Sequence, residues 1–239
     1  MKTDKQFPAL GVQNTKRISN DRLAKKTVII SGGMLEEAFV LETLRGEDVD
    51  FIIGVDRGAA FLYNHQITPD YIVGDFDSLE DSVLDYYKTQ TEIPIREFNP
   101  VKDASDTEIA VRLAVELCRE NVMILGATGS RIDHIMANIQ TLKIGYDAGI
   151  HVEIMDSHNR IYLIGGKTVL EKDKAFGSYF SVFPLGTVIE DFNIRGAKYP
   201  LTHHTLVPYD SLCVSNQMEE ERVTIDFPEG FVILMETRD

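Results

Sequence analysis

The chain has 239 residues, of which 44% are hydrophobic and 26% are charged, as expected for one large globular domain or two modest ones. Its net charge of −14 argues against a nucleic-acid-binding surface, which needs stripes of Lys and Arg, and favours a cationic ligand or divalent metal ions. No apolar run approaches the ~20 residues of a membrane span. Two cysteines form no disulfide framework, and Cys118 follows a helical pattern typical of a small core residue. We therefore expect a cytoplasmic protein without nucleic-acid or membrane partners.

Residues 1–26 differ from the rest of the chain. They contain seven Lys or Arg and two Asp, a local charge of +5, which leaves −19 for residues 27–239. The segment has no apolar core of the kind found in secretory signals. We interpret it as a polar N-terminal extension, with a cleaved organelle presequence as the alternative.

Strand and helix patterns then alternate up to about residue 150. Strands are expected at 27–31, 49–56, 71–75, 94–98 and 121–125, and helices at 35–44, 57–66, 80–88, 105–120 and 131–148. The clearest helix begins with Ser105 as N-cap and Glu108 as its capping-box partner. This alternation predicts an α/β domain over residues 27–152, with a mostly parallel sheet flanked by helices.

The helical period disappears after residue 150. Short apolar runs bounded by turn residues follow at 151–156, 160–165, 167–171, 178–185, 187–192, 222–227 and 231–236. They predict a small antiparallel β-sandwich domain over residues 153–239, with the boundary somewhere between residues 150 and 160.

Two sequence patterns resemble functional motifs but lack the residues or the spacing that these motifs require. "GGKT" at 165–168 resembles the end of a phosphate-binding loop, but Ile161 replaces the required first glycine, so a hairpin turn is expected. The histidines, including His203 and His204, lack zinc-ligand spacing with Cys and are expected on the surface or in loops.

Acidic residues gather where the predicted parallel strands end. The set is Asp56, Asp75, Asp77, Asp103, Asp106 and Asp133. Loops at the carboxyl ends of parallel strands line one crevice, so these acids would repel one another unless a hard cation joined them. Mg²⁺ suits such a site because it takes one or two carboxylates plus substrate phosphates. Each Asp alone could be only a helix N-cap, but their recurrence in four successive loops favours a metal–phosphate site.

Glycines and basic residues support this interpretation. Gly126 and Gly129 follow an apolar strand and precede a helix, so the backbone can approach a ligand and the helix N–H groups can meet it. Arg131 offers donors matched to phosphate oxygens, while Arg57 and Lys102 lie beside the acids.

Four segments together resemble, in order and spacing, the catalytic domain of the thiamin pyrophosphokinase family. They are "GVDRGAAFLY", "PDYIVGDFDS", "KDASDTEIA" and "GATGSRIDHIMANI". "FSVFPLG", "GAKYPL" and "VSNQ" resemble its C-terminal domain, so the resemblance runs from about residue 27 to residue 239. It implies ATP and thiamin as substrates, AMP and thiamin diphosphate as products, Mg²⁺ as cofactor, and a homodimer with shared sites.

The resemblance also implies roles for individual residues. Metal ligands would be Asp75, Asp77 and Asp106, with Asp103 as a further candidate. ATP contacts would come from Asp56, Arg57, Gly58, Lys102, Gly126, Thr128, Gly129, Ser130 and Arg131. Thiamin would meet Asp133, Ser215 and Asn216. The catalytic set would be Asp75, Asp77, Asp103, Asp106, Arg131 and Asp133, with either Asp133 or Asp103 accepting the hydroxyl proton.

The chain departs from the family pattern at several positions, and two other functions also fit its residues. Ser105, Ser130 and Gln217 differ from the commoner family residues, and the chain has no Trp to stack on thiamin, so Phe, Tyr or an aliphatic side chain must do so. "DFDS" also fits a phosphatase loop with Asp75 as the nucleophile. A non-catalytic nucleotide or thiamin sensor with the same fold is the third interpretation.

Overall fold

The structure, a computed structural model, describes residues 25–77, 79–97 and 104–239. Lys102 and Asp103, and residues 1–24 of the expected extension, lie outside the described residues. Within the described part of the chain, no helix combines the length and apolar character needed to cross a membrane.

Strands and helices alternate through the first half of the chain. The helices are α1 (Glu37–Leu44), α2 (Arg57–Asn64), α3 (Asp81–Gln90), α4 (Asp106–Glu116) and α5 (Ile132–Ala148), and a short 3₁₀ turn covers Lys172–Lys174. The strands are β1 (Lys26–Ile30), β2 (Val49–Val55), β3 (Tyr71–Gly74), β4 (Ile95–Glu97), β5 (Asn121–Leu125), β6 (His151–Met155), β7 (Asn159–Ile164), β8 (Thr168–Glu171), β9 (Tyr179–Pro184), β10 (Ile189–Arg195), β11 (Leu201–Leu206), β12 (Arg222–Asp226) and β13 (Val232–Thr237).

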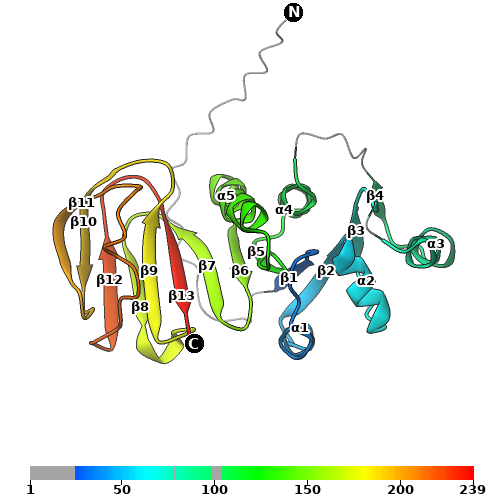
Figure 1. The fold of residues 1–239 in the computed structure, drawn as a ribbon, viewed down its shortest axis with the longest axis horizontal. Helices are drawn as coiled ribbons and strands as arrows, with labels where there is room; N and C mark the ends of the chain where they lie inside the picture. The colour runs from blue at the N-terminus through cyan, green and yellow to red at the C-terminus, as the bar shows by residue number, and fades with distance from the viewer. Residues whose placement is uncertain (1–24, 78, 98–103) are drawn as a thin grey trace, which may run out of the picture.

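One long sheet runs through the described residues in the order β4-β3-β2-β1-β5-β6-β7-β13-β9. The pairs from β4 to β6 are parallel, and β7, β13 and β9 continue the sheet antiparallel. Helices α4 and α5 cover one face of the parallel part, and α1 and α2 cover the other (Figure 1). The predicted α/β architecture is confirmed.

The central strands are hydrophobic at successive positions because both faces of the sheet are covered. In β1, Ile29 packs toward α4 and α5, whereas Val28 and Ile30 pack toward α1 and α2. All three side chains are fully buried. This double burial fixes the strand ends, and therefore the loops that carry the acids.

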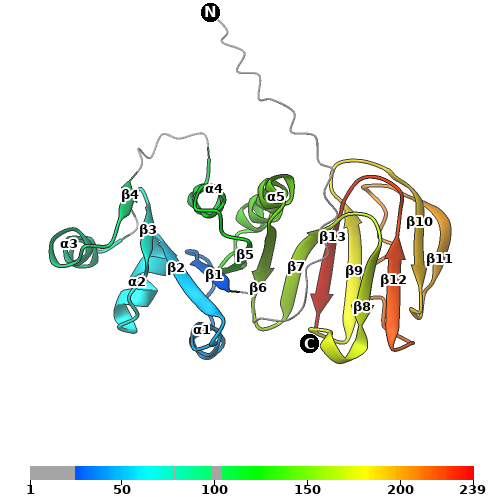
Figure 2. The ribbon, with the colours of Figure 1, turned by 180° about the vertical axis from the view of Figure 1, so that it is seen from behind.

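A second sheet, ordered β11-β10-β12-β8, completes a sandwich with the antiparallel end of the long sheet (Figure 2). Its core joins Phe192, Ile194 and Val223 to Phe180 and Leu234 of the long sheet. The predicted sandwich is therefore present. The boundary expected between residues 152 and 153 falls inside β6, which pairs in parallel with β5 and antiparallel with β7.

Some sequence expectations are wrong in detail. No strand was expected at β11, a strand at the edge of its sheet whose polar sequence has no hydrophobic alternation to reveal it. Within it His203 is exposed, as expected, and His204 is half-buried. The "GGKT" segment passes from one sheet to the other, since β8 pairs with β12, so it is no hairpin. Helix α4 ends at Glu116, and Cys118 beyond it is exposed with φ +55°, not a core residue.

Candidate active site

Three of the predicted acids meet at the carboxyl ends of β2 and β3. Val55 pairs with Val73 across these parallel strands, so Asp56 and Asp75 leave the sheet side by side. Asp106 is the first residue of α4 and lies close enough to share a hydrogen bond with Asp56. The sequence-based expectation that separate loops would bring these acids together therefore holds for Asp56, Asp75 and Asp106.

Their proximity changes the acidity of Asp56. Burial raises its pKa, and so do the charge of Asp106, the hydrogen bond with Asp106 and the charge of Asp75. A hydrogen bond from the Phe76 backbone offsets only part of this, and the pKa of Asp56 rises to about 7. Asp56 Oδ1 is buried and has no hydrogen-bond partner among the described residues. The cluster therefore concentrates negative charge that these residues do not neutralise at Asp56.

Two residues at the ends of these strands have strained backbone conformations. Asp56 and Phe76 have φ values of +45° and +60°, which L-residues seldom adopt. Gly74 makes room for the Asp56 carboxylate, because a Cβ there would lie 2.0 Å from Asp56 Oδ1. Phe76 is only 5% exposed, and the Asp77 N–H donates to Asp75 Oδ1 at 3.3 Å. Strain of this kind persists where the surrounding fold enforces it, often at functional sites.

The start of α4 is fixed by two hydroxyl groups. The Glu108 N–H donates to Ser105 Oγ at 3.2 Å, which confirms the predicted N-cap. The Glu108 carboxylate pairs with Arg112. Ser31 Oγ, at the end of β1, hydrogen-bonds Thr107 Oγ1 over 2.6 Å in a buried position. These bonds anchor the first turn of α4 and thereby position Asp106.

The glycine loop after β5 is tied to the loop after β1. The N–H groups of Gly33 and Met34 donate to the carbonyls of Gly126 and Thr128, both over 2.8 Å. Gly126 has φ +69°, and a Cβ there would lie 2.4 Å from the Ser31 carbonyl oxygen. The loop is thus a fixed backbone platform beside the acids.

The beginning of α5 is exposed. Arg131 and Asp133 form an ion pair at 2.6 Å, with 68% and 65% of their side chains exposed. Hydrogen bonding to Arg131 lowers the pKa of Asp133, and the His134 N–H also contributes. Ser130 is exposed and Thr128 half-buried. In this form of the protein the Arg131 guanidinium is directed to the Asp133 carboxylate.

Two further predicted ATP contacts, Arg57 and Gly58, lie in the first turn of α2. Arg57 is exposed, whereas Gly58 is buried against β1, where a Cβ would lie 1.9 Å from the Ile30 carbonyl oxygen. Gly58 therefore lets the first turn of α2 sit on the sheet.

The donor set fits a hard cation. The converging groups are carboxylate oxygens, one of them buried without a partner in the described part of the chain, and oxygen ligands are those Mg²⁺ prefers. No group of three or more His, Cys, Asp or Glu within the described residues is arranged to hold a metal by itself. Mg²⁺ therefore stays a prediction, and it is one in which substrate phosphates complete the coordination.

The predicted thiamin residues lie in the sandwich. Ser215 is exposed with φ +56°. Asn216 is only 2% exposed. Its Oδ1 accepts from the N–H groups of Tyr199 and Gln217, and its Nδ2 donates to the Tyr199 carbonyl at 2.8 Å. The Asn216 amide is thus occupied within the fold, where it holds Tyr199, whose side chain is 56% exposed, next to the Ser215 loop.

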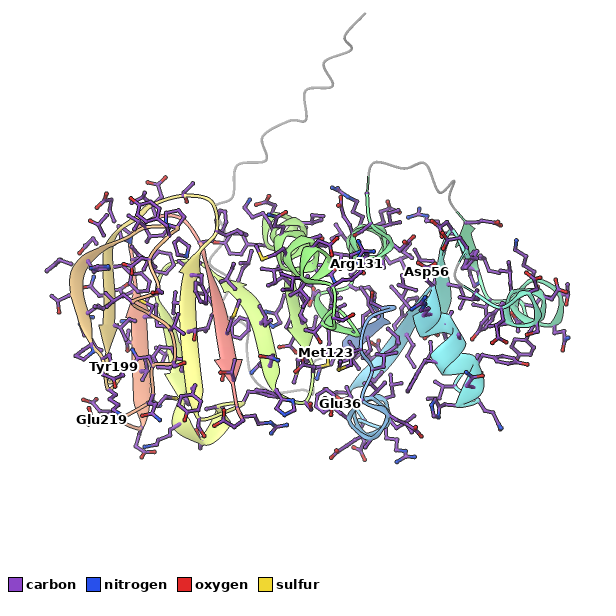
Figure 3. All side chains as sticks on the ribbon, viewed as in Figure 1. Glu36, Asp56, Met123, Arg131, Tyr199 and Glu219 are labelled. Atoms are coloured by element: carbon purple, nitrogen blue, oxygen red, sulfur yellow. The ribbon has the colours of Figure 1, made fainter. Side chains whose placement is uncertain are left out.

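These sandwich residues lie far from the acids of the same chain. Asn216 bridges to β9 at the far edge of the long sheet. Seven strand spacings of roughly 4.8 Å separate β3 from β9, which amounts to roughly 30 Å. Tyr199 and Asp56 accordingly lie toward opposite ends of the molecule (Figure 3).

Sequence reasoning missed several residues that build the site. Ser31, Gly33 and Asn138, whose amide donates to the Ala127 carbonyl at 2.8 Å, position the glycine loop or α4. "SGG" after the first strand was the available signal for the first two. Tyr199 lies in the quoted "GAKYPL", but only its bonds to Asn216 connect it with Ser215.

Two family models match the chain. The model "Thiamin pyrophosphokinase, catalytic domain" matches residues 45–154, and "Thiamin pyrophosphokinase, vitamin B1 binding domain" matches residues 167–232. The two matches fall on the α/β part and on the sandwich respectively.

Individual thiamin pyrophosphokinases also match the chain. The chain is 31% identical over 189 residues to a thiamine pyrophosphokinase of Bacillus subtilis, covering 78% of this chain and 87% of that protein. The crystal structure of the Bacillus subtilis enzyme superposes with a TM-score of 0.79 at 29% identity over 90% of this chain and 100% of that one. That of a Geobacillus thermodenitrificans thiamin pyrophosphokinase gives 0.76 at 30% identity, covering 90% and 98%. With matching family models on both halves and relatives that align along most of its length, this chain belongs to the thiamin pyrophosphokinase family.

Proposed function

We propose that the protein transfers pyrophosphate from ATP to the hydroxyl of thiamin, giving thiamin diphosphate and AMP. Family membership supports the reaction. The observation that carries it in this chain is the convergence of Asp56, Asp75 and Asp106 beside the glycine loop at one edge of the sheet. A sensor that bound nucleotide without turnover is distinguished from this enzyme by product formation.

Asp75, Asp77 and Asp106 would hold Mg²⁺, with Asp103 as a further ligand. When bound, the ion supplies charge neutralisation for the polyphosphate and orients it. Asp56, Arg57 and Lys102 would line the phosphates around this cluster. The backbone of Gly58, Gly126 and Gly129 would approach them closely, and Thr128, Ser130 and Arg131 would donate hydrogen bonds from the other side.

In the transfer itself, the thiamin hydroxyl oxygen forms a bond to the β-phosphorus. The bond from that phosphorus to the oxygen bridging it to the α-phosphate breaks, and AMP leaves with the electron pair. A carboxylate, Asp133 or Asp103, accepts the hydroxyl proton. For Asp133 this requires Arg131 to turn toward the phosphates, which would also return the lowered pKa of Asp133 toward its ordinary value. Positioning and charge compensation supply most of the acceleration.

Thiamin would lie between Asp133 and the sandwich loop. Ser215 offers a hydroxyl to the pyrimidine ring, and we assign the stacking surface to Tyr199, the exposed aromatic side chain beside it. Asn216 would act by holding both residues in place. The roughly 30 Å between these residues and the acids supports a homodimer in which each site joins the α/β part of one subunit to the sandwich of its partner.

The chain would act in the reducing cytoplasm. Cys118 and Cys213 are both unpaired, and Cys213 is buried, which suits that compartment.

The reaction is tested by incubating the protein with ATP, Mg²⁺ and thiamin and following the products by ion-pair chromatography. We expect AMP and thiamin diphosphate in equal amounts. Release of inorganic phosphate together with trapping of a phosphorylated Asp75 would favour the phosphatase interpretation instead. Nucleotide binding without any product would favour the sensor.

The shared site is tested by mixing two inactive variants. Asp75→Asn removes charge from the acid cluster, and Asn216→Ala releases the loop that holds Ser215 and Tyr199. After subunit exchange, one site of a mixed dimer carries both changes and the other carries neither, so activity should return toward half of the wild-type value per mixed dimer. If exchange is demonstrated by mass spectrometry and activity does not return, the shared-site arrangement is wrong.

A further inference from the structure

Phe76 stands between the two aspartates that follow β3, and it differs from both in exposure. Its side chain is buried, with 5% exposed, whereas Asp75 is half-buried and Asp77 is exposed. Its φ of +60° lies in the left-handed region, which makes it an outlier for a bulky side chain. Strain at such a residue points to something that the residue holds in place.

The ring of Phe76 is anchored in a small apolar cluster. The other buried members come from α2, β3 and α3, and they are Ala59, Ile72, Val83 and Tyr87. The Tyr87 hydroxyl donates to the Ala59 carbonyl at 3.0 Å, which ties α3 to α2. Burial of the ring in this cluster stabilises the left-handed backbone that an exposed residue would leave.

The backbone of Phe76 has fixed partners as well. Its N–H donates to the Asp56 carboxylate, and its carbonyl accepts from the Leu79 N–H at 3.2 Å. At the same turn the Asp77 N–H reaches Asp75 Oδ1 at 3.3 Å. Because the ring, the N–H and the carbonyl of Phe76 are all held, this residue sets the direction of the chain on both sides of itself.

Gly74 brings the Phe76 ring close to the Asp56 carboxylate. A Cβ at Gly74 would lie 2.0 Å from Asp56 Oδ1 and 3.1 Å from Phe76 Cε1. The ring and the carboxylate therefore both pack against the last residue of β3, and a change of conformation at Phe76 would reach the acid beside it.

We infer, on the basis of the proposed function, that Phe76 is a positioning residue for the metal–phosphate site. Its buried ring selects the left-handed turn, and the turn sets the positions of Asp75 and Asp77, two of the residues that would hold Mg²⁺. Phe76 acts only through these neighbours. Because Mg²⁺ demands near-ideal geometry from its ligands, loss of the turn weakens metal binding and leaves thiamin binding unchanged.

Two isomeric substitutions separate this role from packing alone. Phe76→Leu and Phe76→Ile bury the same atoms, but branching at Cβ makes a positive φ strongly unfavourable for Ile. We expect Phe76→Leu to keep the Mg²⁺ requirement of the wild type. Phe76→Ile should raise the Mg²⁺ concentration for half-maximal turnover about tenfold, with the KM for thiamin unchanged.

The matched control is Val83→Ala. Val83 lies on α3, is 3% exposed and belongs to the same apolar cluster as Phe76. Its truncation should lower the Tm, because it leaves a cavity in that cluster, without changing the Mg²⁺ requirement.

Amide hydrogen exchange of the metal-free proteins, followed by NMR, gives a readout that does not depend on turnover. The N–H at position 76 donates to the Asp56 carboxylate, so loss of the turn exposes it to solvent. We expect this amide to exchange about tenfold faster in Phe76→Ile than in the wild type, and at the wild-type rate in Phe76→Leu and Val83→Ala.

Equal Mg²⁺ requirements in Phe76→Leu and Phe76→Ile, or equal exchange rates, would show that Phe76 is only a core residue and would overturn the inference. So would a rise in the Mg²⁺ requirement of Val83→Ala that matches the rise in Phe76→Ile. Wild-type turnover separates the two proposals. Thiamin diphosphate from the wild type, with no difference between the isomeric variants, refutes only the positioning role. No thiamin diphosphate from the wild type refutes the reaction, and the exchange rates then decide the positioning role by themselves.

Discussion

Folding takes the carboxylates of Asp56 and Glu153 out of water and shifts their pKa values in opposite directions. At Asp56, burial and the neighbouring Asp106 and Asp75 raise the pKa to about 7. At Glu153, only 5% exposed, burial acts in the same direction, but hydrogen bonds and charge from His151 and Arg160 overcome it and lower the pKa to about 2. Arg160 Nε lies 2.7 Å from the Glu153 carboxylate.

The difference is the source of the compensating charge. The chain supplies its own cation to Glu153, which makes that cluster a completed part of the fold. Among the described residues, none supplies a cation to Asp56. At Asp56 a metal ion held together with substrate phosphates would supply the missing positive charge, and this is the physical content of the metal–phosphate proposal.

Removing metal ions should produce the largest effect. We expect EDTA to abolish turnover and excess Mg²⁺ to restore it, since oxygen ligands bind hard cations. The unfolding transition of the enzyme in EDTA, followed by circular dichroism, should stay cooperative because the Glu153 cluster needs no ion. Full activity after thorough chelation would show that the Asp56 cluster needs no metal ion, and it would contradict the proposed difference from the Glu153 cluster.

Neutralising one acid should come next. Asp75→Asn and Asp77→Asn should each lower kcat about 100-fold or more, because each removes charge that holds the metal. Asp85→Asn, at an exposed position of α3, is the control and should leave kcat unchanged. Folding should survive in all three proteins. Near-normal turnover in both site variants would remove these residues from the mechanism.

At the Glu153 cluster we expect a substitution to change the free energy of unfolding. Glu153→Gln removes the nearer of the two carboxylates that pair with partly buried Arg160, Glu153 and Glu236. It should lower the free energy of unfolding by about 2 kcal/mol at pH 7. Because the folded-state pKa of Glu153 is depressed, its contribution is present above its unfolded value near 4.5 and is lost as pH falls toward about 2. Urea unfolding at several pH values checks this.

The control for Glu153 is Glu97→Gln. Glu97 forms an exposed ion pair with Lys88, and removing it should change stability little. A difference between wild type and Glu153→Gln that did not shrink below pH 4.5 would contradict the electrostatic origin.

The smallest effect should have the opposite sign. Without metal or nucleotide, Asp56 binds a proton more tightly in the folded state than in the unfolded one, so its ionisation destabilises the fold as pH rises from about 3.8 toward about 7. Asp56→Asn should therefore be more stable than wild type at pH 8, by about 1 kcal/mol after allowance for solvent screening. Equal stabilities at pH 8 would show that the cluster is not under electrostatic strain.

The features that the sequence predicts are local patterns, whereas the features that it does not predict are contacts between residues far apart in the chain. Strand ends and helix starts are local patterns, and parallel strands bring their ends together whatever else the chain does. The sequence therefore predicts that Asp56, Asp75 and Asp106 meet. The Ser105 cap was local as well. By contrast, the Ser31–Thr107 bond and the bonds of Asn216 join residues far apart in sequence, and no local pattern reports them.

Polar strands were hidden for a related reason. The edge strand β11 buries little on either face, so hydrophobic alternation, the signal for a half-buried strand, is absent. The sequence predicts a core position for Cys118 because the helical period continues past the point at which α4 ends.

The position of β13 has a consequence for how the protein is made. This strand lies between β7 and β9 in the long sheet, although it is translated after both of them. While a ribosome is still producing the intervening segment, β7 and β9 each present an unpaired hydrogen-bonding edge that another nascent chain could occupy. Completion of the long sheet must therefore follow translation of Val232–Thr237.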